Sequence, residues 1–242
     1  MPAYRRGMTK LNILVTGTSR GIGKSIAAAL SAHNVVGHSS RDGDDHRIAA
    51  DLSKAGAPER LWSEALERLG GRIDVLVNNA GIFEAAPIDQ PHDDWLAAWE
   101  RTMRVNLTAS AELCRLAVLH FRERGSGRLV NVASRAAYRG DSPQHWHYAA
   151  SKAGMIGMTK TIARGYAGES ILAFAVCPGF TMTGMAEDYV ESRGGSKLLA
   201  DIPLGRVATT DEIAETVRWL AVDAPASATG AVIDVNGASF VR

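Results

Sequence analysis

The chain has very little cysteine: only Cys114 and Cys177 occur among its 242 residues, and their spacing matches neither a metal site nor a redox pair. Both lie in apolar stretches, so we expect them to be reduced core residues of a cytoplasmic protein that binds no metal. No apolar run is long enough to cross a membrane, and residues 1–10 lack the apolar core of a secretion signal. We therefore expect no membrane partner.

The sequence also lacks an excess of charge of either sign, because 27 basic and 26 acidic residues give a formal net charge of +1. This balance argues against a polyanionic partner such as nucleic acid. Hydrophobic residues make up 46% of the chain, which is ample for a buried core. No repeat, linker or low-complexity segment divides the sequence. We predict a flexible N-terminal extension over 1–9, with Met8 as a second candidate start, and a single domain over 10–242.

Short apolar runs alternate with longer amphipathic ones, a pattern typical of a doubly wound parallel sheet with helices on both faces. We predict strands at 12–16, 34–39, 47–50, 73–78, 128–133, 171–177 and 231–235. We predict helices at 24–30, 57–69, 93–124, 148–167 and 211–222. The 93–124 stretch is expected to be interrupted near its start, and Thr210 is expected to be the N-cap of the last helix. The predicted fold class is α/β.

Three glycines follow the first predicted strand in the spacing G-x-x-x-G-x-G, as Gly17, Gly21 and Gly23. A glycine turn between a strand and a helix binds phosphate well, because backbone N–H groups and the positive end of the helix dipole converge there. Glycines also occupy ordinary left-handed turns, so the spacing alone leaves that alternative open. The strand and helix on either side favour the phosphate site.

Tyr148 and Lys152 stand four residues apart in a predicted helix, so their side chains share one face. An ammonium beside a phenol favours the phenolate and is expected to lower the tyrosine pKa from its usual value of about 10. Such a phenol can pass a proton to or from a carbonyl or carbinol oxygen. The alternative is an exposed helical pair without a function.

Five residues of interest come at the ends of predicted parallel strands: Gly17, Asp51, Asn79, Ser134 and Pro178. The carboxyl ends of such strands meet at one edge of the sheet, and open α/β sheets bind ligands there. We therefore expect these segments to form one site.

Six motifs occur in one order along the chain: Thr16-Gly17-Thr18-Ser19-Arg20-Gly21-Ile22-Gly23, Asn78-Asn79-Ala80-Gly81, Asn106, Ser134, Tyr148-x-x-x-Lys152 and Pro178-Gly179-x-x-x-Thr183. Together they resemble the short-chain dehydrogenase/reductase family, in the branch that contains the oxoacyl-carrier-protein reductases. The resemblance implies a Rossmann-like fold and an oxidoreductase that transfers a hydride between a nicotinamide cofactor and a carbonyl or secondary alcohol.

The resemblance implies four catalytic residues, Asn106, Ser134, Tyr148 and Lys152, with Tyr148 as the general acid/base. Ser134 would hold the reacting oxygen, and Asn106 would open its helix locally and support a water that links Lys152 to solvent. The interval from Ser134 to Tyr148 is one residue longer than expected, which makes Ser142 a rival serine. Without the resemblance, Asn106 would be an exposed helical asparagine and Ser134 a serine that closes a turn.

The resemblance also carries over cofactor-binding residues: Gly17, Ser19, Arg20, Gly21, Ile22, Gly23, Ser39, Ser40, Arg41, Asp51, Leu52, Asn79, Ala80, Gly81, Tyr148, Lys152, Pro178, Gly179, Thr181 and Thr183. A carboxylate at the end of the second strand pairs with the ribose 2′-hydroxyl of NAD, whereas arginine or hydroxyls accept the 2′-phosphate of NADP. The segment 39–41 has no acid, and Arg20 lies in the neighbouring turn, although Asp42, Asp44 and Asp45 follow. We expect NADP, with NAD as the alternative.

The sequence does not identify the substrate, and a polyol, a sugar, an acyl thioester and a cyclic ketone are all candidates. The segments expected to contact it carry His145, Trp146, His147, Met182, Met185, Tyr189 and Lys197. Two other functions share the fold. A catalytically silent nicotinamide sensor is disfavoured by the intact tetrad, and a nicotinamide-dependent isomerase, epimerase or dehydratase usually needs a longer chain.

Two helices expected on one side of the sheet, over 98–124 and 148–167, carry more apolar or small residues than one buried face requires. These residues include Ala109, Leu113, Leu116, Leu119, Phe121, Ala149, Met155, Met158 and Ile162. Their family counterparts pair across a two-fold axis, and the apolar end of the chain over 236–242 suggests a second contact. We expect a homotetramer, with a dimer as the alternative.

Overall fold

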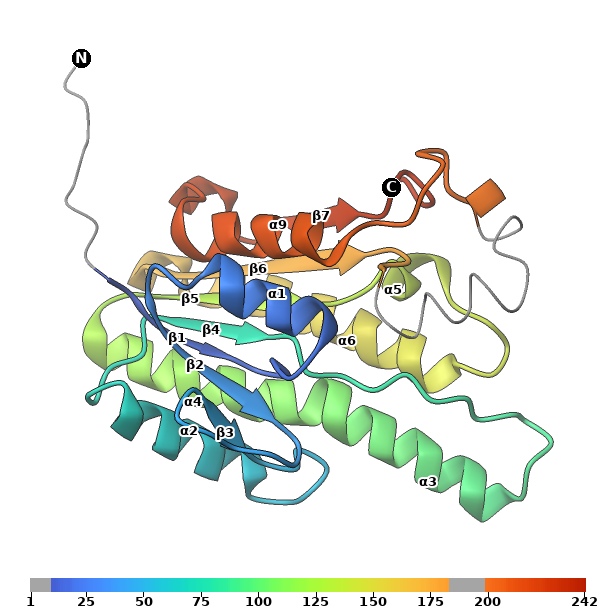
Figure 1. Cartoon of the computed structure of the whole chain (residues 1–242), viewed down its shortest axis with the longest axis horizontal. Coiled ribbons are helices and arrows are strands. Elements are labelled where there is room, and N and C mark those ends of the chain that lie inside the picture. The colour runs from blue at the N-terminus through green and yellow to red at the C-terminus, as the bar shows by residue number, and fades with distance from the viewer. Residues whose placement is uncertain (1–9, 183–198) are drawn as a thin grey trace.

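The computed structural model describes residues 10–182 and 199–242 (Figure 1). Within them, one seven-stranded sheet contains β1 (Asn12–Val15), β2 (Asn34–Ser39), β3 (Arg47–Ala49), β4 (Val75–Asn78), β5 (Gly127–Val132), β6 (Ile171–Pro178) and β7 (Val232–Val235). The strand order is β3-β2-β1-β4-β5-β6-β7, and all pairings are parallel. The predicted α/β class and parallel sheet are confirmed.

β1 lies inside the sheet, and later strands lie on both sides of it. β2 and β3 add on one side of β1, and the chain then returns to place β4 on the other side. The carboxyl ends of β1 and β4 are therefore neighbours at the point where the strand order reverses. Open parallel sheets bind ligands at such a point.

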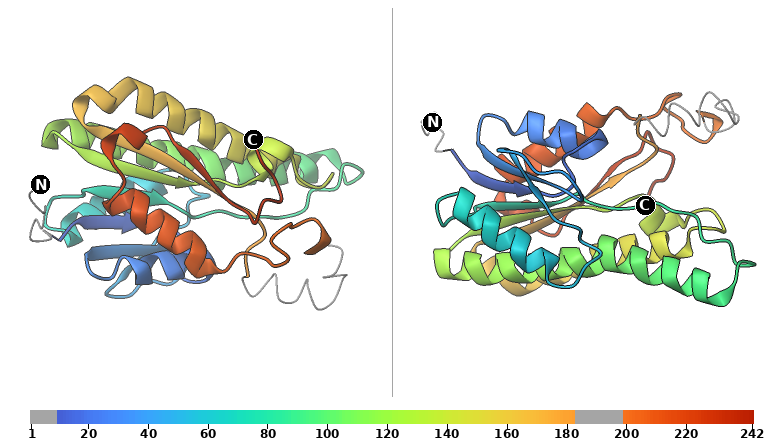
Figure 2. Two further views of the ribbon diagram at one scale, coloured as in Figure 1. Left: turned by 90° about the horizontal axis from the view of Figure 1, so that it is seen from above. Right: turned by 60° about the horizontal axis from the view of Figure 1, so that its bottom comes forward.

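Helices cover both faces of the sheet (Figures 1 and 2). On one face lie α1 (Gly21–Ala29) and α9 (Thr210–Val222), and on the other lie α2 (Ala57–Arg68), α4 (Ala109–Arg124) and α6 (Trp146–Tyr166). Ile13 and Val15 of β1 pack toward α1 and α9, whereas Leu14 packs toward α2 and α4. Because both faces are buried, most positions of the central strands are apolar, which is why these strands were predictable. Among the described residues, no helix is long and apolar enough to cross a membrane.

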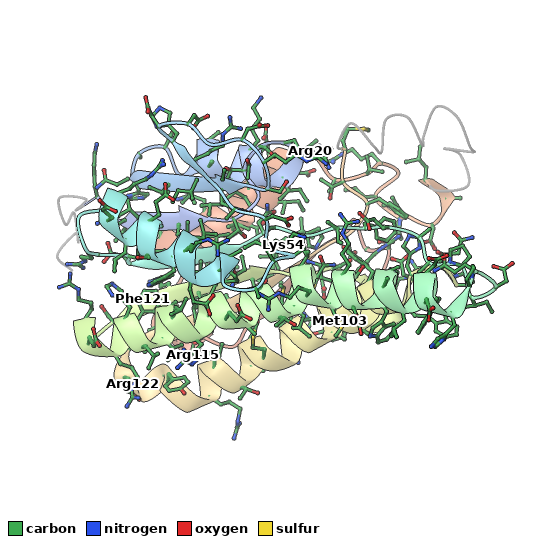
Figure 3. All side chains as sticks on the ribbon, turned by 90° about the horizontal axis from the view of Figure 1, so that it is seen from below. Arg20, Lys54, Met103, Arg115, Phe121 and Arg122 are labelled. Carbon is green, nitrogen blue, oxygen red and sulfur yellow. The ribbon has the colours of Figure 1, made fainter. Side chains whose placement is uncertain are left out.

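Phe121 holds α4 close to the sheet, where its ring is fully buried (Figure 3). Gly127 at the start of β5 permits this approach, because a Cβ there would lie 2.1 Å from the Phe121 ring. Arg115 and Arg122 on the same helix are exposed, and Arg122 pairs with Glu169 at 2.7 Å. Helix α4 therefore has one face committed to the core and one to solvent.

The interruption predicted in 93–124 exists, but it lies in the middle of the stretch rather than near its start. A π-helical segment, Arg104–Thr108, joins α3 (His92–Met103) to α4. Asn106 at its centre is fully buried. Its Nδ2 donates to Ile82 O at 2.9 Å, and its Oδ1 accepts from Ile82 N at 2.8 Å. Because these bonds come from a distant loop, the helical pattern could not locate the break.

The N-cap of α9 is Thr209 and not the predicted Thr210. Thr209 Oγ1 accepts from Glu212 N at 3.2 Å, and the Glu212 carboxylate accepts from Thr209 N at 2.8 Å, which forms a reciprocal capping box. Arg206, together with this box, lowers the pKa of Glu212 to about 2. Thr210 instead accepts from Ser25 Oγ at 2.9 Å and so joins α9 to α1.

Most of the apolar residues expected to form a subunit contact are buried in the chain's own core. Ala109, Leu113, Phe121, Met155 and Ile162 are each at most 9% exposed. Leu119 is 44% exposed, while Leu116 and Met158 pack partly buried against the core. The prediction of a broad apolar surplus on both helices is therefore wrong, and Leu119 is what remains of it on α4.

The last residues of the chain are held against β7. Arg242 Nε donates to Asp234 Oδ2 at 2.9 Å, and Arg242 Nη1 donates to Tyr138 Oη at 3.0 Å. Phe240 stacks on the Tyr138 ring with 5.9 Å between ring centres. These contacts hold the end of the chain without a partner chain, so the reason given for a second subunit contact there does not apply.

The two cysteines are both free and buried, as predicted. Burial raises the pKa of each thiol to about 12. Neither thiol is therefore available as a thiolate at neutral pH.

Candidate active site

The segments predicted to form the site reach one edge of the sheet. Gly17 follows β1, Asp51 follows β3, Asn79 follows β4 and Ser134 follows β5, while Pro178 is the last residue of β6. Because the strands are parallel, these residues share the carboxyl edge.

The glycine turn is a tight cradle between β1 and α1. Gly17 has a φ of +71° and Gly21 a φ of +54°, which side chains with a Cβ rarely adopt. A Cβ on Gly23 would lie 1.9 Å from Gly17 O. Within the described part of the chain, no side chain caps α1, so the N–H groups of its first turn can bind an anion. This geometry fits a dinucleotide pyrophosphate better than an ordinary turn.

Asn79 and Ala80 fasten the end of β4 to the glycine turn. The N–H groups of Asn79 and Ala80 both donate to Thr16 Oγ1, at 3.0 and 2.9 Å. Asn79 Nδ2 donates to Thr16 O at 2.9 Å and to Gly17 O at 3.1 Å. These bonds fix the end of β4 to the glycine turn at the centre of the sheet.

Gly81 brings the end of β4 to two of the predicted catalytic residues. A Cβ at this glycine would lie 3.4 Å from Asn106 Oδ1 and 3.5 Å from Lys152 Nζ. Lys152 is 4% exposed, and its Nζ donates to Val132 O at 2.9 Å. The helix break at Asn106 and the buried lysine therefore lie beside the same glycine.

Ser134, and not the rival Ser142, contacts the tyrosine of the predicted tetrad. The Ser134 hydroxyl acts to lower the pKa of Tyr148, and Ser134 Oγ accepts from Ala136 N at 3.1 Å. Ser142 is exposed, and its hydroxyl lies 2.6 Å from His145 Nδ1. The structure thus brings together Ser134, Tyr148, Lys152 and Asn106.

The prediction that Lys152 lowers the pKa of Tyr148 is wrong for this structure. Burial raises the pKa of Tyr148 to about 12, and the Ser134 hydroxyl opposes this rise. Burial also lowers the pKa of Lys152 to about 8. Lys152 Nζ lies 5.8 Å from the centre of the Tyr148 ring and binds a backbone carbonyl. The prediction counted the attraction between the charges but omitted the cost of burying them.

The residues expected to choose between NADP and NAD are mostly accessible. Ser40 and Arg41 are exposed after β2, and Ser19 and Arg20 are exposed on the glycine turn, with Arg20 at the start of α1 (Figure 3). Ile22, in contrast, packs against the core under α1 and α9. Arg20 and Arg41 therefore remain the candidates for a phosphate contact.

Ser39 and Asp44 are already bonded within the chain, whereas the sequence suggested a free hydroxyl and a free carboxylate there. Ser39 is buried, and its hydroxyl is bonded to the backbone N–H and C=O of Asp42. It therefore supports the turn and does not present a free hydroxyl. Asp44 pairs with Arg47 at 2.6 Å, so its charge is already partly balanced.

The side chains of Asp51 and Leu52 are already engaged within the chain. Asp51 Oδ1 accepts from Ser53 N at 3.0 Å and from Ser53 Oγ at 2.7 Å, which is the capping role that any aspartate there would have. Leu52 is 3% exposed and belongs to the core. Leu52 can therefore offer a ligand only its main chain, whereas Asp51 is exposed and holds Ser53 through Oδ1 alone.

The segment after β6 is closely packed at its start. A Cβ on Gly179 would lie 2.8 Å from Asn236 Cα, and Gly179 N donates to Val235 O at 3.0 Å. Thr181 is 8% exposed, and its hydroxyl donates to Gly179 O at 3.1 Å. Thr183, Met185, Tyr189 and Lys197 lie outside the described residues.

Aromatic rings adjoin the tyrosine, and sequence reasoning missed one of them. Phe83, five residues after β4, stacks on His145 with 3.9 Å between ring centres and meets Tyr148 edge-on at 4.7 Å. It is 50% exposed. His147 is buried and stacks on Trp99, and burial lowers its pKa. Phe83 carried no sequence signal beyond its place after Asn79-Ala80-Gly81.

His38 is a second residue that sequence reasoning missed. It lies in β2 and is 3% exposed. Gly17 N donates to its Nδ1 at 3.1 Å, so the imidazole contacts the glycine turn directly. The available signal was a histidine directly after the short apolar run Val35-Val36-Gly37.

Known proteins resemble the chain over nearly its whole length. The family model described as enoyl-(acyl carrier protein) reductase matches residues 17–238. The acetoacetyl-CoA reductase of Rhizobium meliloti (strain 1021) is 33% identical over 238 residues, covering 94% of this chain and 97% of that protein. The 3-oxoacyl-[acyl-carrier-protein] reductase of Synechocystis sp. is 36% identical over 244 residues, covering 93% and 94%.

A solved structure gives the same result for the fold. It is a protein of Beutenbergia cavernae, provisionally described as an NAD(P)-dependent gluconate 5-dehydrogenase and solved with bound NADP at low occupancy. Its TM-score is 0.86 at 30% identity, covering 95% of this chain and 96% of that one.

The fold and the site together define an NAD(P)-dependent oxidoreductase that acts on CH–OH and C=O groups. The chain belongs to the short-chain dehydrogenase/reductase family, as the order of its motifs predicted.

Proposed function

We propose that this protein is an NADP(H)-dependent carbonyl reductase or secondary-alcohol dehydrogenase in which Tyr148 is the general acid/base. The observation that carries the proposal is the placement of the Ser134 hydroxyl, which acts to lower the pKa of Tyr148, at a tyrosine one helical turn from the buried Lys152. The three residues share the sheet edge with the glycine turn. Two hydroxyls arranged in this way can hold a carbonyl oxygen and protonate it.

The chain's own residues have distinct tasks in this mechanism. When bound, the nicotinamide supplies or accepts the hydride. The first turn of α1 binds the pyrophosphate through its N–H groups. Ser134 holds the substrate oxygen, while Tyr148 gives it a proton during reduction and takes one during oxidation. Because its pKa is raised to about 12, Tyr148 carries its proton at neutral pH, which suits the reductive direction.

Lys152 and Asn106 support the proton transfer. Burial lowers the pKa of Lys152 to about 8, close enough to neutrality for the ammonium to return a proton to the phenolate that Tyr148 becomes after it protonates the substrate. Asn106 holds both backbone groups of Ile82 and so fixes the adjoining Gly81 beside Lys152. The relay through a water at Asn106 belongs to this proposal.

The preference for NADP is supported by charge. Arg20 and Arg41 are both exposed near the expected 2′-phosphate, and position 39 holds a serine instead of an acid. The related structure from Beutenbergia cavernae was solved with NADP. NAD remains the alternative cofactor.

For the substrate we propose a small carbonyl compound with an apolar portion next to the carbonyl. The exposed Phe83 ring beside Tyr148 forms an apolar wall, which suits an acyl thioester or a cyclic ketone better than a polyol. The relatives named above are reductases of acetoacetyl-CoA and of 3-oxoacyl groups on carrier protein.

A substrate panel followed by nicotinamide absorbance tests the proposal. Acetoacetyl-CoA, cyclohexanone, 5-ketogluconate and a polyol would each be assayed with NADPH and NADH. We expect the highest kcat/KM for acetoacetyl-CoA with NADPH. Binding of neither cofactor, measured by calorimetry, would contradict the proposal. Turnover that favours the polyol would contradict the proposed substrate class alone.

We also infer a homotetramer, with a dimer as the alternative. The support is Leu119 on α4 and Trp146 at the start of α6, which are 44% and 54% exposed. Closed symmetric contacts commonly cover such side chains. Sedimentation at micromolar concentration tests this, and a mass near the 25.8 kDa of one chain would refute both assemblies.

A further inference from the structure

We propose that His38 is a positioning residue for the glycine turn, and that only its neutral form with a proton on Nε2 holds this turn in the shape that binds a dinucleotide. The inference rests on the proposed function in one respect, which is that a nicotinamide dinucleotide binds at the turn.

Hydrogen-bond chemistry fixes the state of the His38 ring. Gly17 N donates to Nδ1 at 3.1 Å, and Nε2 lies 2.7 Å from Ala50 O. A backbone N–H can only donate, and a carbonyl oxygen can only accept. Nδ1 must therefore carry the lone pair and Nε2 the proton. The two partners leave no choice of tautomer.

His38 joins two segments of the cofactor side of the site. Gly17 opens the glycine turn, and Ala50 immediately precedes Asp51. The main chain of His38 strengthens the link, because its carbonyl accepts from Thr18 N at 2.8 Å and its N–H donates to Thr18 Oγ1 at 3.2 Å. One buried residue thus connects the turn to β2 and to the end of β3.

The position of Gly17 depends on partners on both sides. Its carbonyl accepts from Asn79 Nδ2 at 3.1 Å, and its N–H donates to His38. A Cβ on Gly17 would lie 2.9 Å from Ala80 Cα, so the backbone already runs close to β4. Without the imidazole, Gly17 N–H loses its acceptor and the turn loses the support on its β2 side.

Protonation of His38 would have the same effect as its removal. A proton on Nδ1 would face the Gly17 N–H, so two donors would oppose each other. Burial lowers the pKa of His38 from its usual 6.5, opposed by the bond to Ala50, so the ring is neutral at pH 7 and charges only in acid. The segments next to His38 carry the charged side chains of Arg20, Arg41, Asp42, Arg47 and Asp51. None of these side chains is a cause of the shift in the His38 pKa.

Two other histidines provide matched controls. His33 Nδ1 accepts from Leu11 N at 3.3 Å just before β1, and His120 Nε2 accepts from Ile73 N at 3.2 Å just before β4. Because the strands are parallel, both bonds lie at the amino edge of the sheet, away from the site. They repeat the chemistry of His38 without contact with the turn.

The first test measures the Kd of NADP⁺ by calorimetry at pH 7.5 on the full chain. His38→Leu removes both side-chain bonds and should raise Kd about 5- to 30-fold, as expected for an unpaired donor. His38→Asn places an oxygen where Nδ1 stood and should recover most of this loss. His33→Leu should leave Kd within about twofold, even if the melting temperature falls. A His38→Leu protein that binds like wild type overturns the proposal, as does a loss that His38→Asn does not recover.

A second test needs only a folded wild type and His38→Asn. NAD⁺ is the probe, because the 2′-phosphate of NADP⁺ itself titrates near pH 6. The affinity of wild type should fall as the pH is lowered from 7.5 toward 5, and His38→Asn should not show this fall. Nitrogen NMR should report the Nε2–H tautomer. The same pH dependence in both proteins, or an Nδ1–H tautomer, overturns the proposal, whereas a wild type that binds neither dinucleotide overturns the proposed function as well.

Discussion

The two halves of the site edge are built differently. On the cofactor half, after β1, β2 and β3, the backbone of Gly17 is bonded on both sides and the Ser39 hydroxyl is tied to Asp42. On the substrate half, the Phe83 ring beside Tyr148 is 50% exposed. The first half is preorganised for one shape of ligand, while the second offers apolar surface to a ligand whose shape it does not dictate. The motifs that identify the family lie mainly in the first half, and so they reveal the cofactor better than the substrate.

Replacement of the tyrosine where the two halves meet should have the largest effect. Tyr148→Phe should lower kcat by about 10²- to 10⁴-fold, because the transferable proton is lost, while the Kd of NADPH stays nearly unchanged. Tyr166→Phe, at the far end of α6, is the control and should keep full activity. Steady-state kinetics and calorimetry measure both, and a Tyr148→Phe protein with more than roughly a tenth of wild-type kcat would contradict the role of this residue.

A charge reversal on the cofactor half should change selectivity. Arg41→Asp should weaken NADPH relative to NADH by roughly 30- to 150-fold, which corresponds to about 2–3 kcal/mol for a lost phosphate contact and an added repulsion. Arg115→Asp makes the same change in net charge on the exposed side of α4 and should leave the ratio unchanged (Figure 3). If wild type already binds NADH more tightly than NADPH, the proposed cofactor preference is wrong.

A single methyl group should disrupt the preorganised turn. Gly23→Ala should weaken NADPH roughly 10- to 100-fold, because the new Cβ would lie 1.9 Å from Gly17 O and force the turn to move. Gly165→Ala on α6 is the control, since a Cβ there would have no neighbouring group within 4 Å among the described residues outside its own helix backbone. Calorimetry with NADPH measures the change, and unaltered affinity in Gly23→Ala would show that the turn does not hold the cofactor.

The buried lysine should lower the stability of the protein. Because its folded pKa of about 8 lies below the usual 10.5, burial of the Lys152 charge is unfavourable at pH 7, and this penalty vanishes as the pH rises from 8 to 10.5. Lys152→Met should therefore raise the free energy of unfolding by about 1–3 kcal/mol at pH 7. Urea unfolding at pH 7 and pH 10 checks this. We expect the gain in free energy of unfolding of Lys152→Met over wild type to shrink between pH 7 and pH 10. A gain that grows with pH would contradict the prediction.

The smallest effect is expected on the substrate half. Phe83→Ala should raise KM about 3- to 10-fold with little change in kcat, because one aromatic contact contributes about 1 kcal/mol. Ile88→Ala, at a 65% exposed position of the same loop, is the control. Equal KM values for Phe83→Ala and wild type would show that the Phe83 ring does not contact the substrate.

The sequence predicted those features that depend on local pattern. Strand 171–177 was found because burial on both faces leaves an unbroken apolar run, and β6 spans Ile171–Pro178. The site edge was found because parallel strands place Gly17, Asn79 and Ser134 together whatever their loops do.

The features that sequence reasoning missed depend on contacts between distant residues. The apolar pattern alone misplaced the helix break, which lies at Asn106 as the family resemblance implied, where this side chain binds Ile82, 24 residues away. The Tyr148 pKa rises because of burial, which no spacing reveals. His38 belongs to no motif, and its importance appears only when β2 lies beside the glycine turn.

The π-helical segment has a consequence for how the chain tolerates changes in length. An α-helix turns about 100° per residue, so one extra residue in a turn rotates α3 by that angle relative to α4. With this offset, α4 faces the sheet through Phe121 while Trp99 of α3 stacks on His147 of α6. Deletion of one residue from Arg104–Thr108 would leave both helices intact, but α3 and α4 could no longer make their contacts with α6 and with the sheet at the same time. At this place the count of residues matters more than their identity.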